Sequence, residues 1–339
     1  HRNGTDHPEE QRHGPAAQKR FTTSLMEHTD PHQIPDDETL RESPSPAAAL
    51  LPKPPGWPYM TYPEAVLMSV VFLVLQILIG AFIGILIAIG GLVFGVSPEQ
   101  NLALSNPAAF MVANLWAVLP LFVWGWFRSG QTVREAFALR AFPWTVLPAL
   151  VFMGIGAALL MSELDNLTRR LIPLPTLFPE VFDSLFSSPV LGFFIVVIMA
   201  PLTEEPLFRG IILRGLRRQH GTGGSCIVSA LLFALIHLNP PQLLPAFLLG
   251  LLLAGIQLRT GSLWPCVWLH AVINFVPLGA FGLFPDQLPG LTTPPEAGLF
   301  HPLWLDALAL TLFLAGVVSF CAATRSRPSS AARPESQDS

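Results

Sequence analysis

Long apolar runs separated by short polar stretches dominate residues 58–323 of the chain. A helix that crosses a bilayer needs about 20 mostly apolar residues. Some of the runs are short or polar for a helix that crosses a bilayer, and we expect the longer helices to surround them. The pattern predicts an all-α, polytopic membrane bundle of about eight transmembrane helices. The expected helices cover residues 66–94, 108–127, 144–161, 189–217, 225–238, 243–258, 263–278 and 303–323.

The composition supports a membrane protein rather than a soluble one. Hydrophobic residues make up 51% of the chain and charged residues only 12%. A soluble globular protein carries about 25% charged residues, so this chain has too little charge to cover a water-facing surface of its size. We therefore expect the lipid bilayer to surround the bundle. The small net charge of −4 predicts no nucleic-acid partner.

Polar segments flank the bundle and divide the chain further. Residues 1–57 are polar and Pro-rich and lack a basic stretch followed by an apolar one, so they are not expected to be a signal peptide. They and residues 324–339 are predicted to be disordered tails. Residues 128–143 are typical of a short amphipathic helix at the interface. The remaining predicted divisions are N-terminal helices with that interfacial helix (58–184), a core that holds the chemistry (185–280), and a last helix with its preceding loop (281–323).

Basic residues predict the orientation of the bundle. They follow the even-numbered runs, whereas only Arg169 and Arg170 lie in the opposite loops. Cytoplasmic loops carry an excess of Lys and Arg, so these exits and both termini are expected in the cytoplasm. The residues on the predicted cytoplasmic side are Arg128, Arg134, Arg140, Arg214, Arg217, Arg218, Arg259, Arg325 and Arg327.

The fourth run, "APLTEEPLFRGIILRGLRRQ", contains two adjacent carboxylates, Glu204 and Glu205. An acidic residue at the centre of a span costs about 2.5–3.5 kcal/mol, so unpaired carboxylates there require a reason. Arg209 follows Glu205 by four residues and shares its helical face. We expect a buried Glu205–Arg209 ion pair, which leaves Glu204 on another face and available for chemistry. Pro206 removes a backbone N–H beside the carboxylates and should disturb the helix.

Two further runs carry polar pairs at helical spacing. Phe233 and His237 ("FALIH") lie one turn apart, and so do His270 and Asn274 ("HAVIN"), so each pair projects from one face. The sequence "LNPP" after His237 predicts the end of that helix. An intramembrane histidine alone is usually a hydrogen-bonding group between helices, and His270 with Asn274 fits that role equally well. All these polar residues together, within about 70 residues of apolar sequence, favour catalysis.

Two mechanisms fit the constellation. In the first, Glu204, His237 and His270 bind Zn²⁺ and leave one position for water. In the second, which needs no metal, Glu204 and His237 activate water and His270 with Asn274 stabilise the oxyanion. Both hydrolyse an acyl bond, most simply that of a peptide or protein substrate at the membrane. The chain has no HExxH motif, which excludes a zincin-type site.

The three motifs resemble those of the CPBP intramembrane proteases, also called the CAAX protease, bacteriocin-processing or Abi family. That family carries EExxxR, FxxxH and HxxxN or HxxxD on separate transmembrane helices. The resemblance covers about residues 185–280 and implies an eight-helix endopeptidase with its site open to the cytoplasm. It implies that Glu204, His237, His270 and Asn274 act directly, while Glu205, Arg209 and Phe233 support them.

The resemblance also sets the expected substrates and the alternatives. It implies a prenylated CAAX-type or leader-peptide substrate, and a bacterial plasma membrane as the location. It leaves a metalloprotease and a metal-independent glutamate protease equally open. The first alternative is a non-catalytic membrane scaffold or bacteriocin self-immunity protein of the same fold. A transporter with a carboxylate–histidine proton relay is the other, and the lack of an internal repeat counts against it.

Overall fold

A computed structural model describes residues 60–95, 107–172, 189–293 and 299–325. The chain separates into two units, His1–Pro54 and Pro55–Ser339, and every described element belongs to the second. The predicted disordered tails, residues 1–57 and nearly all of 324–339, lie outside the described residues.

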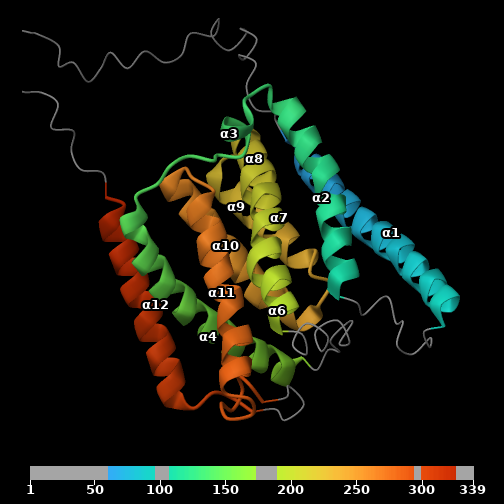
Figure 1. The fold of residues 1–339 in the computed structure, drawn as a ribbon. Helices are drawn as coiled ribbons and strands as arrows, with labels where there is room; N and C mark the ends of the chain where they lie inside the picture. The colour runs from blue at the N-terminus through green and yellow to red at the C-terminus, as the bar shows by residue number, and fades with distance from the viewer. Residues whose placement is uncertain (1–59, 96–106, 173–188, 294–298, 326–339) are drawn as a thin grey trace, which may run out of the picture. The chain divides into compact units, whose positions relative to one another are not determined.

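Every described element is helical (Figure 1). Among the described residues, seven helices are long and apolar enough to cross a membrane, and α9 is a shorter apolar helix. Together they confirm the predicted all-α bundle of about eight helices. The elements are α1 (Tyr62–Phe94), α2 (Pro107–Ser129), α3 (Val133–Ala136), η2 (Trp144–Val146), α4 (Leu147–Leu171), α6 (Pro189–Gly192), η3 (Phe193–Met199), α7 (Ala200–Glu205), η4 (Pro206–Ile212), α8 (Leu213–His220), α9 (Thr222–Leu235), η5 (Pro240–Gln242), α10 (Leu243–Thr260), α11 (Trp264–Leu283) and α12 (Leu303–Ala323).

The polar stretch at residues 128–143 is less helical than predicted. Only α3 forms there, and Thr132 and Glu135 cap it reciprocally. The Thr132 hydroxyl donates to the Glu135 carboxylate and holds the pKa of that carboxyl below its usual value. Ala138 then adopts a positive φ of 53°, which a helix cannot accommodate. A helix therefore forms over only one turn here, and the interfacial position stays a prediction.

Helix α4 continues to Leu171, well beyond its predicted end at Met161. Hydropathy alone misplaced this end, because the last turns carry charged residues. Arg169 and Asp165 form an i,i+4 ion pair of 2.7 Å there, which supports the helix outside its apolar part. This polar extension supplies side chains at one end of the bundle.

The helices α4 and α12 pack closely side by side (Figure 1). Glycines on both helices permit this approach. A Cβ added at Gly156 would collide with the backbone of Phe313, and one at Gly316 would collide with the backbone of Met153. Small residues at helix interfaces allow such backbone contact in membranes. α4 also packs against α11, so it connects α12 to the core.

The C-terminal end of α12 lies near the basic residues. Arg214 donates to the Glu135 and Ala136 carbonyls at 2.6 and 2.9 Å, which joins α8 to α3. Arg259 bonds Thr324, which joins the end of α10 to the end of α12. These contacts gather several of the predicted cytoplasmic arginines at one end of the bundle.

We predict that Gly316→Ala reduces the free energy of unfolding in detergent micelles by about 1–3 kcal/mol, because the added methyl would collide with N, Cα and Cβ of Met153, which move only with the backbone. Gly255→Ala is the matched control, since a Cβ at Gly255 meets nothing within 4 Å. Equal effects of the two variants on the unfolding midpoint would contradict the close α4–α12 contact.

Candidate active site

The span that carries the two carboxylates is a helix of mixed hydrogen-bond pattern. α7 lies between two π-helical segments, η3 and η4. The N–H of Ala200 bonds the Ile195 carbonyl and the N–H of Leu213 bonds the Phe208 carbonyl, five residues back in each case. Proline lacks the N–H that continues an α-helical pattern, and a π turn is one way to bypass the gap. The disturbance expected from Pro206 takes this form, and π turns are frequent at functional sites.

The first π segment creates a docking point for Asn274. In a π turn the carbonyl of Val196 would accept from residue 201, which is a proline without an N–H. Asn274 of α11 donates its side-chain amide to this carbonyl instead, at 2.8 Å. The bond fixes the Asn274 side chain against the fourth span and satisfies a buried acceptor.

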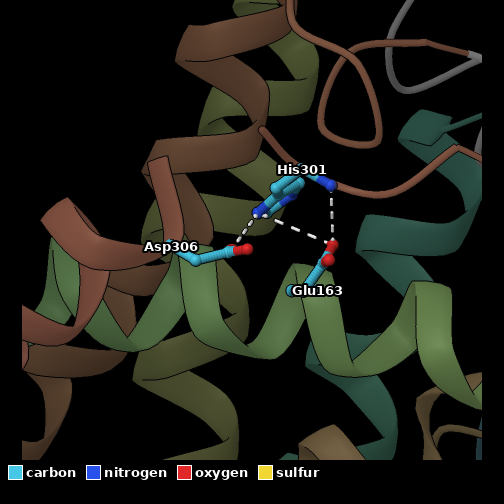
Figure 2. Close-up of side chains that lie close together, drawn as sticks. All are labelled: Glu163, His301 and Asp306. Carbon is cyan, nitrogen blue, oxygen red and sulfur yellow. Dashed lines mark hydrogen bonds and ion pairs between the residues drawn. The ribbon is translucent and has the colours of Figure 1, made fainter. Parts of the chain in front are cut away.

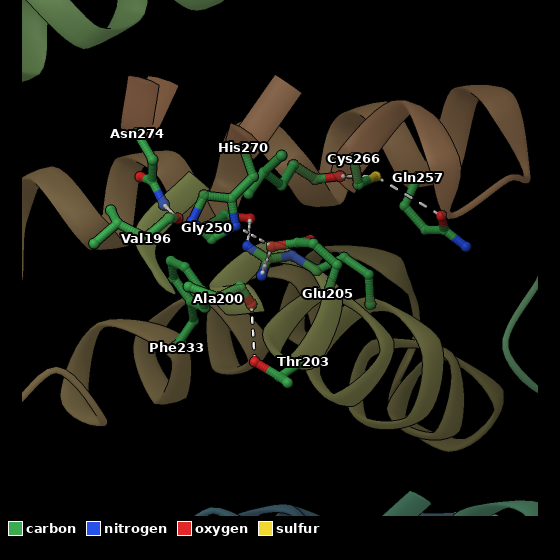
Figure 3. A network of polar contacts seen from close by, with 12 residues as sticks. Val196, Ala200, Thr203, Glu205, Phe233, Gly250, Gln257, Cys266, His270 and Asn274 are labelled. Carbon is green, nitrogen blue, oxygen red and sulfur yellow. Dashed lines mark hydrogen bonds and ion pairs between the residues drawn. The ribbon is translucent and has the colours of Figure 1, made fainter. Parts of the chain in front are cut away.

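Glu205 is the centre of the polar network (Figure 3). Its side chain is fully buried, and one oxygen, Oε1, lies 3.1 Å from Nη1 of Arg209. This confirms the predicted i,i+4 ion pair. The same oxygen lies 2.8 Å from Nδ1 of His270 on α11. The structure therefore joins His270 to the ion pair, a contact that the sequence did not reveal.

Arg209 is held by more than its carboxylate. Its Nη2 donates to the Gly250 carbonyl of α10 at 3.3 Å, and its guanidinium carbon lies 4.3 Å from the centre of the Phe233 ring. A cation over an aromatic face is attracted by the ring quadrupole, more strongly when desolvated. A Cβ at Gly250 would lie 2.7 Å from the Ala230 Cα, so only glycine allows α9 and α10 to meet here.

The Phe233 ring also contacts both histidines. Its centre lies 5.0 Å from that of His237 and 5.8 Å from that of His270, with edge-to-face geometry in both cases. The two imidazoles therefore flank one aromatic ring. Phe233 thus contacts three of the polar side chains, and its supporting role stays a prediction.

His237 lies just beyond the end of α9, as "LNPP" predicts. Its Nδ1 is 2.8 Å from the Phe233 carbonyl. A carbonyl can only accept, so Nδ1 carries the hydrogen and Nε2 of the neutral ring keeps its lone pair. The ring is half-buried, which leaves room for a ligand to approach. Nε2 of His237 can therefore act as a base or as a metal ligand.

Glu204 is buried, with 9% of its surface exposed, and its Oε2 has no hydrogen-bond partner among the described residues. A buried polar atom without a partner is costly, and such groups are rare unless they have a role. Oε2 of Glu205 is also buried without such a partner, so the two glutamates differ at Oε1, which in Glu205 accepts from Arg209 and His270. The division between a supporting and an available carboxylate stays a prediction.

The predicted metal ligands are not brought together closely. The donor atoms of Glu204, His237 and His270 do not all lie within 4.8 Å of one another. Donors that share a tetrahedral zinc lie about 3.3 Å apart, given bonds of 2.0–2.2 Å. The separation of these donor atoms does not fit a zinc ion bound by all three residues.

Sequence reasoning missed two backbone groups that hold the site, the carbonyls of Val196 and Gly250. Every residue has a carbonyl, so no side-chain signal distinguishes them. A weak signal existed in each case: Pro201 leaves the Val196 carbonyl without a helical donor, and Gly250 interrupts a leucine-rich run.

Fold and site together define a polytopic helical membrane protein with a buried carboxylate, arginine and histidine network. Residues 186–276 match a family model described as type II CAAX prenyl endopeptidase Rce1-like. The match confirms the predicted resemblance over that segment, which contains all the residues discussed from Val196 to Asn274. The chain is thus an integral membrane protein with an Rce1-like segment.

An uncharacterized 24.3 kDa protein of Escherichia coli is 30% identical over 137 residues. That alignment covers 38% of this chain and 58% of the relative. No solved structure matches the chain.

We predict that Arg209→Met, which keeps most of the side-chain volume, reduces the free energy of unfolding by about 3–5 kcal/mol, because it leaves the Glu205 charge buried without its cation. Arg128→Met is the control: the Arg128–Glu64 pair is about one-third exposed and its loss should cost at most about 1 kcal/mol. Denaturant titration of both purified variants makes the comparison. Similar losses would show that the buried pair has no special role in stability.

Proposed function

We propose that the protein is an intramembrane endopeptidase in which Glu204 and His237 activate a water molecule. The observation that carries the proposal is the pair of buried carboxylates: Oε1 of Glu205 accepts from Arg209 and His270, whereas Oε2 of Glu204, like Oε2 of Glu205, has no partner among the described residues. The Rce1-like match over the same residues supports a protease.

The reaction follows from these groups. Glu204 takes a proton from water while Nε2 of His237 accepts a hydrogen bond from the second O–H and aligns the nucleophile. The water oxygen attacks the scissile carbonyl carbon, and the carbonyl electron pair moves to oxygen. The tetrahedral intermediate collapses with cleavage of the C–N bond, and the proton on Glu204 passes to the leaving nitrogen.

His270 and Asn274 stabilise the oxyanion. Asn274 uses one amide hydrogen on the Val196 carbonyl, which leaves its second hydrogen to donate. Glu205 orients the His270 ring through Nδ1, and a ring with hydrogens on both nitrogens can donate Nε2–H to the oxyanion. Donors fixed in advance by the protein stabilise charge without reorganisation during the reaction.

We infer that the substrate is a peptide that reaches the membrane from the cytoplasm, with a prenylated CAAX-type peptide as the first class to test. The family description names prenyl endopeptidases, and a lipidated peptide would partition into the bilayer beside the bundle. The arginines near α3, α8 and α10 face the cytoplasm in this proposal, with both termini on that side of the plasma membrane.

We predict that Glu204→Gln lowers kcat by about 10²–10⁴-fold on a fluorogenic prenylated peptide, with the protein in nanodiscs, because the amide cannot accept the proton. His237→Asn should lower kcat by a factor in the same range. Asp165→Asn is the control, since Asp165 lies on α4 and pairs with Arg169. Undiminished turnover by Glu204→Gln would reject the protease proposal, and equal cleavage of the unprenylated peptide would reject the lipidated substrate.

The metal-independent mechanism has its own test. We predict that kcat is unchanged when a chelator lowers bound zinc to well below one equivalent, measured by elemental analysis of the same sample. Loss of activity on chelation, with recovery on adding Zn²⁺ and about one equivalent less bound zinc in Glu204→Gln than in the wild type, would favour a zinc ion at Glu204, His237 and His270.

A further inference from the structure

A second polar cluster, drawn in Figure 2, lies at the end of the bundle remote from α3 and α8, where α4 ends and α12 begins (Figure 1). It consists of Glu163 on α4, His301 just before α12, and Asp306 in the first turn of α12. Nδ1 of His301 lies 3.2 Å from Oδ1 of Asp306 and 3.7 Å from Oε2 of Glu163. The proposed hydrolysis uses none of these residues.

The cluster is organised around a buried imidazole. The His301 side chain has no exposed surface, whereas those of Glu163 and Asp306 are 23% and 28% exposed. Two further donors hold Glu163 in place: the His301 backbone N–H and the Asn166 side-chain amide, each 3.0 Å from Oε2. The ligand atoms are therefore fixed by the fold, and an ion can reach them from solvent through the carboxylates.

The other ring nitrogen of His301 also has a partner. Nε2 lies 3.2 Å from the Ser162 hydroxyl oxygen. A histidine that binds a metal usually donates its second N–H to a neighbouring acceptor, which fixes the tautomer. When Nε2–H donates to Ser162, the lone pair of Nδ1 points toward the two carboxylates.

We propose that Glu163, His301 and Asp306 bind a zinc ion. Donors on a tetrahedral zinc lie about 3.3 Å apart, and the separations of 3.2 and 3.7 Å are close to that value. All three ligand atoms lie within 4.8 Å of one another. Three protein ligands leave a fourth position for water.

One hydrogen on Nδ1 can bond Asp306, whereas Oε2 of Glu163, at 3.7 Å from Nδ1, accepts instead from the His301 N–H and Asn166. A divalent cation neutralises both carboxylates at once. The imidazole nitrogen favours zinc over Mg²⁺ and Ca²⁺, which prefer all-oxygen sites with more ligands.

The ion would connect two parts of the chain that are distant in sequence. It joins α4 to the segment before α12, beyond the glycine contacts that hold the middle of these helices together. Asn166 also donates to the Gly290 carbonyl at 2.9 Å, which attaches the loop after α11 to the same place. Zinc bound here stabilises the packing of α12 and of this loop.

The test uses the full-length protein in nanodiscs after chelator treatment and removal of the chelator. Zn²⁺ titration by calorimetry, with elemental analysis after desalting, should give one tight site that Asp306→Asn and Glu163→Gln each weaken by at least about tenfold. At zinc concentrations near 100 times Kd, Tm of the wild type should rise by about 5 °C, and neither variant should show that rise.

Two controls separate this site from other zinc sites. Asp165→Asn removes a neighbouring carboxylate on α4 and should keep wild-type affinity. Glu204→Gln should also keep it, because Glu204 belongs to the other cluster. Tm measured without zinc shows whether each variant is folded. Absence of a tight site in the folded wild type would overturn the proposal, and so would equal affinity in Asp306→Asn or loss of binding in Glu204→Gln.

Discussion

The structure depends on the burial of one carboxylate, Glu205, inside a bundle of apolar helices. A charge in that position is tolerated only when other groups compensate it. The compensation comes from three directions: Arg209 on the same span, His270 on α11, and the Phe233 ring of α9 beneath the guanidinium. Because each partner lies on a different helix or turn, the requirement to neutralise one charge also sets how α7, α9, α10 and α11 are placed around it.

This compensation gives two adjacent carboxylates different contacts. The cation and the imidazole both bond Oε1 of Glu205, while Oε2 of Glu205 has no partner among the described residues, and neither has Oε2 of Glu204. The supporting network thus places strongly polar groups near Glu204 without occupying that oxygen. A buried network of this kind fixes the orientation of its members, which is what the proposed hydrolysis requires of His270.

Much of the fold and part of the site could be predicted from the sequence. Helix α12 has its predicted bounds because hydrophobicity alone determines them, and the Glu205–Arg209 pair follows from helical spacing. The Glu205–His270 bond joins residues 65 positions apart, so it needs the tertiary arrangement. The Glu163, His301 and Asp306 cluster was missed for the same reason, and also because the polar end of α4 continues past the apolar run that predicted the helix.

The two π segments on either side of α7 affect the direction in which Glu204 and Glu205 project from the helix. A π turn holds one residue more than an α turn at nearly the same place in the helix. The rotational phase of Glu204 and Glu205 about the helix axis is therefore set locally, by η3 and η4, and not by the length of the span. Where the other transmembrane helices are regular, they have no π turn that could change the rotational phase of their side chains. The residues that such a helix presents to its neighbours can then change only by substitution. In the fourth span, conversion of one turn between π and α would turn the carboxylates toward different neighbours while the membrane-crossing length stays the same.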